Sequence, residues 1–323
     1  MTKPGHPLTQ SGEIWPALPL ADWEDTYATL HMWTQIVGKV QMKLRPPINH
    51  WWHVPLYLHT RGLATSLIPL GNHGFAIYFD FLDHQLVVET SSGDRRSLPL
   101  KPRSVAEFYR LFTSLLDDLG IRVNIDPMPC EVRDPIPFSQ DTVHASYDPE
   151  FAQRCWRILL ATANVFQKFR SRFVGKCSPV HFFWGSFDLA VTRFSGRRAP
   201  EHPGADPITR EAYSHEVSSA GWWPGGDTLA GIKVPGAAFY SYMAPTPLGF
   251  ADQEVMPKPA VYDSTLGEFL LMYDDMRQQA SPSAVLLDFL QSTYRAGADL
   301  ARWDRAALEQ PESWFNQGEE HAA

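Results

Sequence analysis

A long amphipathic stripe with helical spacing occurs twice in this sequence, and each copy is followed by proline and then by a histidine with aromatic neighbours. Apolar residues three or four positions apart predict one helix from Trp23 to Leu44 and another from Phe151 to Phe173. The strings HWWH at 50–53 and HFFW at 181–184 come next. This repeated order predicts that two similar units build the chain.

The remaining segments support the same order. Residues 49–60 and 179–189 are rich in aromatic and β-preferring residues and predict strands, as do 212–218 and 237–243. Residues 75–82 and 85–90 predict a hairpin. Ser104 with Glu107 forms a capping box that opens a helix to about Leu119, and Ser264 with Glu268 predicts a matching helix to about Gln279.

We therefore predict an α+β fold in which two pseudo-repeated helix–antiparallel strands–helix units form a pseudo-symmetric sheet assembly, followed by a C-terminal helix. The predicted parts are a Pro-rich lead (1–20), a first repeat (20–125), a Pro-rich connector (126–147), a second repeat (148–280), and a C-terminal helix with its tail (281–323).

Charge and cysteine content exclude several classes of protein. The formal net charge is −8 and no basic stripe is present, which argues against nucleic acid or an anionic membrane as the partner. The longest apolar runs fall short of the roughly 20 residues that a membrane span needs. The N-terminus lacks the apolar core of a signal peptide, and the three cysteines form no CxxC pair. We expect a cytoplasmic protein.

A first cluster of candidate site residues lies in the predicted strand at 49–60. His53 and Tyr57 share one face there, and the neighbouring tryptophans favour the wall of a pocket. His50, Trp51 and Trp52 are candidates for binding a substrate. The alternative is a surface strand whose histidines are solvated. Neither HxxH nor HxH on a strand is a strong metal signature, so we predict no metal ligands here.

A second cluster follows His181. In the predicted strand, Trp184 and Asp188 share a face, and Gly185 marks a bulge or a close approach by another group. A buried Asp188 must be hydrogen-bonded or paired. Arg193, still inside the strand, is a candidate for holding an anionic group.

A third cluster spans residues 210–226. His215 and Glu216 are candidates for acid–base catalysis, although adjacent strand residues face opposite ways. Trp222 and Trp223 predict an aromatic loop that contacts a ligand. A histidine bonded to the backbone beside a surface glutamate is the structural alternative.

The strings at 49–57, 181–189 and 213–221 resemble an uncharacterised family of bacterial proteins of about this length, catalogued only as a domain of unknown function. The resemblance spans about Trp15 to Tyr294. It implies a bacterial, single-chain protein and carries no activity, cofactor or catalytic residue.

The leading hypothesis is a small-molecule enzyme or ligand-binding protein with an aromatic, His- and Arg-containing pocket between the two repeats. Catalysis would be proton transfer or hydrolysis, with Arg193 holding an anionic ligand. The alternatives are a protein-interaction module with a Trp-rich surface and, below it, a His-ligated metalloenzyme. The cofactor and the oligomeric state are unknown. The candidate catalytic residues are His53, His215, Glu216 and Asp188, and the candidate binding residues are His50, Trp51, Trp52, Tyr57, His181, Trp184, Arg193, Trp222 and Trp223.

Overall fold

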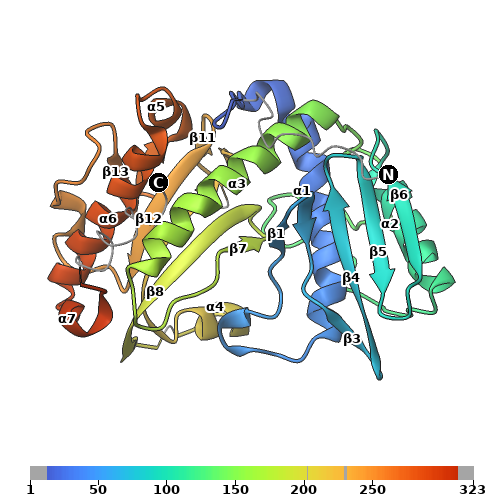
Figure 1. Cartoon of the computed structure of the whole chain (residues 1–323), viewed down its shortest axis with the longest axis horizontal. Coiled ribbons are helices and arrows are strands. Elements are labelled where there is room, and N and C mark those ends of the chain that lie inside the picture. Colours follow the sequence, from blue (N-terminus) through green and yellow to red (C-terminus); the bar gives the residue numbers. More distant parts are fainter. Residues whose placement is uncertain (1–12, 202, 229–230, 312–323) are drawn as a thin grey trace, which may run out of the picture.

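Two antiparallel sheets stand side by side, with helices packed on their faces, in a computed structural model that describes residues 13–201, 203–228 and 231–311 (Figure 1). Part of the predicted lead (1–20) and of the predicted C-terminal tail lies outside these residues. The mixture of helices and antiparallel sheets confirms the α+β class. No helix among the described residues is long and apolar enough to cross a membrane.

The N-terminal sheet has the strand order β1-β2-β4-β5-β6, and β3 pairs with β4. Its strands are β1 (Tyr57–His59), β2 (Gly62–Ala64), β3 (Ile68–Leu70), β4 (His73–Asp80), β5 (Gln85–Thr90) and β6 (Arg95–Pro99).

The C-terminal sheet has the order β13-β14-β12-β9-β8-β7, and a separate two-stranded ribbon joins β10 to β11. These strands are β7 (His181–Phe183), β8 (Asp188–Arg198), β9 (His215–Trp223), β10 (Gly226–Asp227), β11 (Lys233–Val234), β12 (Ala238–Ala244), β13 (Val261–Asp263) and β14 (Glu268–Met272).

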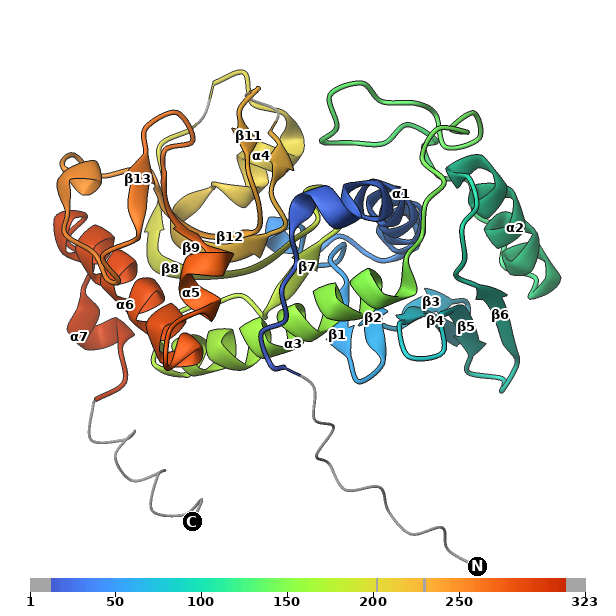
Figure 2. The same ribbon diagram turned by 90° about the horizontal axis from the view of Figure 1, so that it is seen from above.

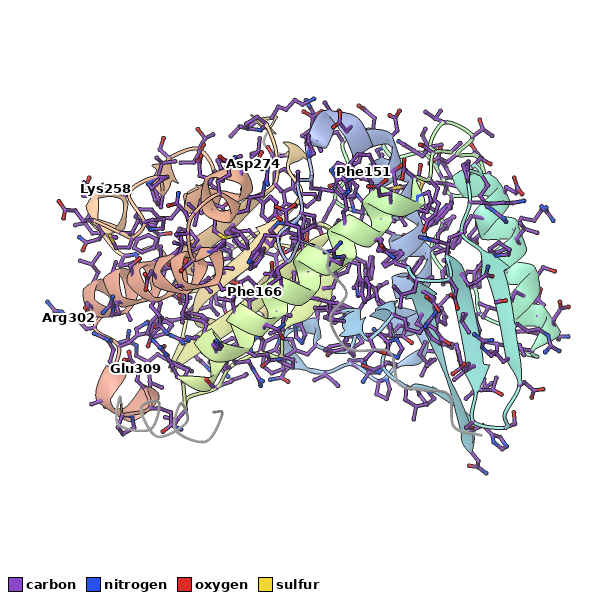
Figure 3. The ribbon with its side chains drawn as sticks, turned by 45° about the horizontal axis from the view of Figure 1, so that its top comes forward. Phe151, Phe166, Lys258, Asp274, Arg302 and Glu309 are labelled. Atoms are coloured by element: carbon purple, nitrogen blue, oxygen red, sulfur yellow. The ribbon has the colours of Figure 1, made fainter. Side chains whose placement is uncertain are left out.

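Helices α3 and α6 cover one face of the C-terminal sheet, and α1 packs against α2, α3 and β3 near the junction of the two sheets (Figure 2). Phe151 near the start of α3 and the fully buried Phe166 farther along show how α3 crosses the molecule (Figure 3). The helices are α1 (Leu20–Leu44), η1 (Asn49–Trp51), α2 (Val105–Asp118), α3 (Pro149–Ser171), α4 (Pro207–Ala212), η2 (Phe250–Asp252), α5 (Tyr273–Arg277), α6 (Pro282–Leu300) and α7 (Arg305–Leu308).

The two sheets meet at one backbone pair, between Leu56 and Phe182. Each N–H donates to the carbonyl oxygen of the other residue over 2.9 Å. Just beyond this pair, Nε1 of Trp184 donates to the carbonyl oxygen of Val54 over 2.7 Å, and the indole packs directly on Gly38 of α1. The junction therefore fixes the position of α1 relative to both sheets.

Local sequence signals correctly predicted most helices. Ser104 accepts a hydrogen bond from the Glu107 amide at the start of α2, and Asp148 accepts two at the start of α3. Gly120 adopts φ +72° just after α2. Helix α1 begins three residues before its predicted start at Trp23, at Leu20 after Pro19.

The strand predicted at residues 49–60 is largely wrong. Residues 49–51 form the 3-10 helix η1, with His50 and Trp51 at positive φ, and only Tyr57–His59 is a strand. The alternation that placed His53 and Tyr57 on one face therefore does not hold. The aromatic residues here pack from a turn, a geometry that strand propensity does not encode.

Three further assignments are corrected. Residues 184–187 form a turn between β7 and β8, so Trp184 and Asp188 do not share a strand face. The strand predicted at 212–218 begins only at His215, because α4 extends to Ala212. The segment predicted as a helix from Ser264 contains a strand followed by the short α5. Asp263 caps a turn there rather than a helix. Phe269 and Leu271 are buried two positions apart, which is the spacing of a strand.

Gly38→Ala tests the junction. An added Cβ would lie 2.3 Å from Nε1 of Trp184, so we expect the free energy of unfolding to fall by about 1–3 kcal/mol despite alanine's better helix propensity. Chemical denaturation measures this. Gly236→Ala is the control, because its Cβ would meet no atom within 4 Å. Equal stability of the two variants would show that the Gly38–Trp184 contact is not tight.

Candidate functional site

A cavity of about 1160 Å³ lies on the face of the C-terminal sheet opposite α3 and α6. Its walls come from the N-terminal half of α1, from η1, from the irregular connector at 126–147, and from α4 and β10. The cavity is therefore bounded by segments from both halves of the chain. Its size lies slightly above the usual range for small-molecule sites, about 300–1,000 Å³.

The sheet supplies the cavity floor through strand alternation. Alternate residues of β8, β9, β12 and β14 face the cavity, and the residues between them face the helices. The floor is polar and aromatic rather than aliphatic. It contains Asp188, Ala190, Thr192, Phe194, Val217, Ser219, Trp223, Ala238, Tyr240, Tyr242, Glu268 and Leu270.

Asp188 is the buried centre of this floor. Its carboxylate accepts hydrogen bonds from the hydroxyls of Ser186 and Tyr240, as expected for a buried aspartate. Burial raises the pKa of Asp188, and the two hydrogen bonds oppose that rise. Tyr240 reaches Asp188 from β12 by crossing β9 over Gly221, where an added Cβ would lie 2.3 Å from its ring. Gly221 therefore makes this bond between non-adjacent strands feasible.

Glu131 enters the cavity from the connector. It adopts φ +55°, and its Oε1 lies 2.3 Å from where a Cβ on Gly185 would be. Gln35 of α1 holds the preceding residue, Cys130: its Oε1 accepts from the Cys130 amide over 2.9 Å, and its Nε2 donates to the Cys130 carbonyl over 2.8 Å. The close approach predicted at Gly185 is that of this side chain.

Two cavity carboxyls have pKa values near neutrality. Removal of water by the surrounding protein, reinforced by the charge of Asp188, raises the pKa of Glu131 to about 7 and that of Glu268 to about 7. Asp206 adds to the effect at Glu131 and Asp263 at Glu268. Arg133 is the only Lys or Arg among the described cavity-lining residues, and its guanidinium lies 4.0 Å from Asp227. The cavity is therefore strongly acidic.

A basic group lies at the end of the cavity formed by η1. Nδ1 of His50 donates to the Glu211 carbonyl over 3.1 Å, and its Nε2 accepts from the ammonium of Lys176 over 2.6 Å. Burial and Lys176 lower the pKa of His50. The same ammonium lies 5.3 Å from the ring centre of Trp52 and 4.9 Å from that of Phe194. These contacts keep His50 neutral and fixed.

The structure places four of the predicted site residues along the cavity: His50, Trp52, Asp188 and Trp223. It places His53, Trp51, Tyr57 and His181 beyond the cavity wall. His53 accepts from the Ile48 amide over 3.1 Å, stacks on Trp51, and has its pKa lowered by burial.

His181 is buried at the junction of the two sheets, against Tyr57 and Trp52. Within the described part of the chain its Nε2 has no hydrogen-bond partner, and burial lowers its pKa to about 3.

Five more predicted residues lie away from the cavity. Trp184 and Trp222 are buried. Arg193 is fully buried on the helix side of the sheet, where its guanidinium lies 3.5 Å from the ring centre of Phe169. His215 hydrogen-bonds Ser214, and Glu216 pairs with Arg197 at 2.6 Å. None of the five tryptophans predicted to contact a ligand is exposed, so these positions do not form a flat tryptophan surface.

Sequence reasoning missed Glu131, Glu268 and Tyr240. Glu131 lies in an irregular Pro-rich segment that carries no periodic signal. Glu268 was assigned to a helix. A strand glycine often marks a close approach, but the strand predicted at 212–218 ended before Gly221, so this pointer to Tyr240 was lost.

One of three comparisons with known proteins finds a match. A model described as a family of unknown function, DUF5996, matches residues 15–310, so the chain belongs to that family. No curated protein and no solved structure matches.

In the part of the chain that the structure describes, no group of three or more His, Cys, Asp or Glu side chains is placed to hold a metal ion.

Glu268→Gln will change the pH dependence of stability. A carboxyl whose pKa rises from 4.5 to about 7 on folding stabilises the protein fully below pH 4.5 and loses that contribution as pH rises through 7. The stability of the wild type relative to Glu268→Gln should therefore fall between these pH values, measured by denaturation in urea.

Asp80→Asn is the matched control for this window. Burial alone would raise the pKa of Asp80, but hydrogen bonds from Arg61 and two backbone amides outweigh it and lower the pKa below 3.8. The stabilisation from the ionised Asp80 is lost only in more acidic solution. The difference in the free energy of unfolding between Asp80→Asn and wild type should therefore stay constant between pH 4.5 and 7. If the free energy of unfolding of Glu268→Gln also differed from that of wild type by a constant amount, the raised pKa of Glu268 would be contradicted.

Gly185→Ala should release Glu131 from the cavity. The added Cβ overlaps the flexible end of the Glu131 side chain and not its backbone, so the fold should persist while the carboxyl moves toward water. The pKa of Glu131 should then fall from about 7 toward its ordinary value of 4.5. Titration by carbon NMR of labelled glutamate measures it. An unchanged pKa would mean that contact with Gly185 does not hold Glu131 in place.

Proposed function

We propose that this member of the DUF5996 family binds a positively charged organic small molecule in the cavity on its C-terminal sheet. One observation carries the proposal: Asp188, Glu131 and Glu268 all face a cavity whose described lining holds a single arginine and no lysine. An ionised cluster of this kind is costly without a counter-charge. A bound cation would supply that charge and lower the pKa of each carboxyl.

The aromatic lining supports the same ligand class. Tyr27, Trp52, Phe183, Trp223 and Tyr242 line the cavity together with the carboxylates. Aromatic faces attract ammonium and quaternary ammonium groups, and the attraction strengthens where water is displaced. The volume of about 1160 Å³ leaves room for a molecule larger than its charged group alone.

A cationic ligand replaces the anionic one suggested by Arg193. That arginine lies on the opposite face of the sheet, against Phe169, Phe173 and Tyr294. Burial lowers its pKa to about 10, and its role there is packing between α3, α6 and β8. The acidic cavity would repel an anion.

We also propose that the chain contains an internal duplication and that the protein works in a reducing compartment. In support of duplication, α1 and α3 each precede the strand at the inner edge of a sheet, and the two edges meet through Leu56 and Phe182. In support of a reducing compartment such as the cytoplasm, Cys130, Cys155 and Cys177 are all unpaired.

Choline and its uncharged isostere 3,3-dimethyl-1-butanol test the ligand class. Choline should raise the melting temperature and bind in calorimetry, whereas the isostere should do neither. The affinity for choline should rise from pH 6 to pH 8, because Glu131 and Glu268 lose their protons across this range. Glu131→Gln and Glu268→Gln should each weaken binding about tenfold, or about 1.4 kcal/mol.

Glu216→Gln is the control, because it removes a carboxylate that lies outside the cavity. It should leave choline binding unchanged. Equal binding of the isostere would reject charge recognition. If neither choline nor the larger polycation spermidine binds, the proposed function fails.

A further inference from the structure

A second group of polar residues, Asp141 and His144, lines the cavity from the connector. Nδ1 of His144 lies 2.7 Å from Oδ2 of Asp141, and the carboxylate accepts the imidazole N–H. This bond fixes the tautomer, so Nε2 carries the lone pair. The Asp141 side chain is 1% exposed and that of His144 is 34% exposed, so the base is accessible while the group that orients it is buried.

The backbone around this pair is firmly held. Oδ1 of Asp141 accepts from the amides of Val143 and His144 over 3.0 and 3.1 Å. Two amides of the first turn of α2 donate back to the same loop: Val105 to the His144 carbonyl over 3.0 Å, and Ala106 to the Asp141 carbonyl over 2.9 Å. Asp141 and His144 are therefore preorganised by the helix that follows β6.

We infer that Asp141 and His144 form a catalytic dyad that activates water to hydrolyse an ester bond in a molecule held in the cavity. The inference rests on the proposed function, because the carboxylates at Asp188, Glu131 and Glu268 would hold the charged end of that molecule. An imidazole oriented by a buried carboxylate is the arrangement used for general base catalysis. Hydrolysis needs no reactant other than the bound molecule and water.

The step balances with these groups alone. Nε2 of His144 takes a proton from water as the water oxygen bonds to the ester carbonyl carbon. The tetrahedral adduct then breaks its bond to the alcohol oxygen, which leaves with the electron pair. The imidazolium returns its proton to that oxygen, and Asp141 stabilises the imidazolium between the two transfers. The products are a carboxylic acid and an alcohol.

A matched pair of p-nitrophenyl esters tests the dyad. One is the ester of 4-(trimethylammonio)butanoic acid, and the other is the uncharged p-nitrophenyl 5,5-dimethylhexanoate of the same shape. We expect the wild type to hydrolyse the cationic ester faster than the neutral one. The absorbance of the released p-nitrophenolate measures both rates. His144→Gln should lower the rate for both esters by about 100-fold, within the usual contribution of a general base.

Two further variants complete the test. Asp141→Asn keeps an oxygen for the loop amides but removes the carboxylate, and should lower the rate about tenfold or more with little change in melting temperature. His73→Gln removes an exposed histidine at the start of β4 and should leave the rate unchanged. A rate that survives His144→Gln, or a wild type no faster than buffer, overturns the dyad. If choline binds but neither ester is hydrolysed, only the dyad is overturned. If both esters are hydrolysed equally and choline does not bind, only the proposed function is overturned.

Discussion

Helix α1 is buried on every side from Leu30 to Gln41, so its polar side chains must be satisfied inside the protein. Nε2 of His31 donates to the Gly185 carbonyl over 2.7 Å, Gln35 holds both backbone groups of Cys130, and Lys39 donates to the Met128 carbonyl over 2.6 Å. Gln41 donates to two carbonyls just before β1 and accepts from the Ser66 amide. Because of these bonds, α1 organises the segments that surround the cavity.

The same requirement positions the acidic groups. His31 holds the 184–187 turn, which precedes Asp188, and Gln35 holds the residue before Glu131. Burial lowers the pKa of His31 to about 4, so its imidazole is a neutral donor and adds no positive charge beside the carboxylates. The helix therefore brings two acids together without neutralising them. Burial raises the pKa of both acids, and the charge of Asp188 raises that of Glu131 further.

Sequence reasoning succeeded where the determinants are local. The cap at Ser104 and the period of α3 are encoded within a few residues. It failed at Ser264, where a cap-like spacing coincides with a turn and Phe269 and Leu271 follow the period of a strand. It also treated α1 as a helix with one buried stripe, because no local signal shows that its polar residues are covered by a segment about 90 positions away. In the site, Asp188 was recognisable as an acid in an apolar strand, whereas Glu131 acquires its place only through tertiary contacts.

The connector is the segment on which the chemistry of the cavity depends. Its first part, 126–131, is anchored on α1 through Gln35 and Lys39, and its later part, 141–144, is anchored on the first turn of α2. Glu131 and His144 thus belong to one irregular segment but take their positions from different helices. The floor of the cavity comes from the C-terminal sheet, and the groups that face it are placed by helices that pack with the N-terminal half. The distance across the cavity is therefore set by how the two halves pack, so a change at their junction alters the site even when every lining residue is retained.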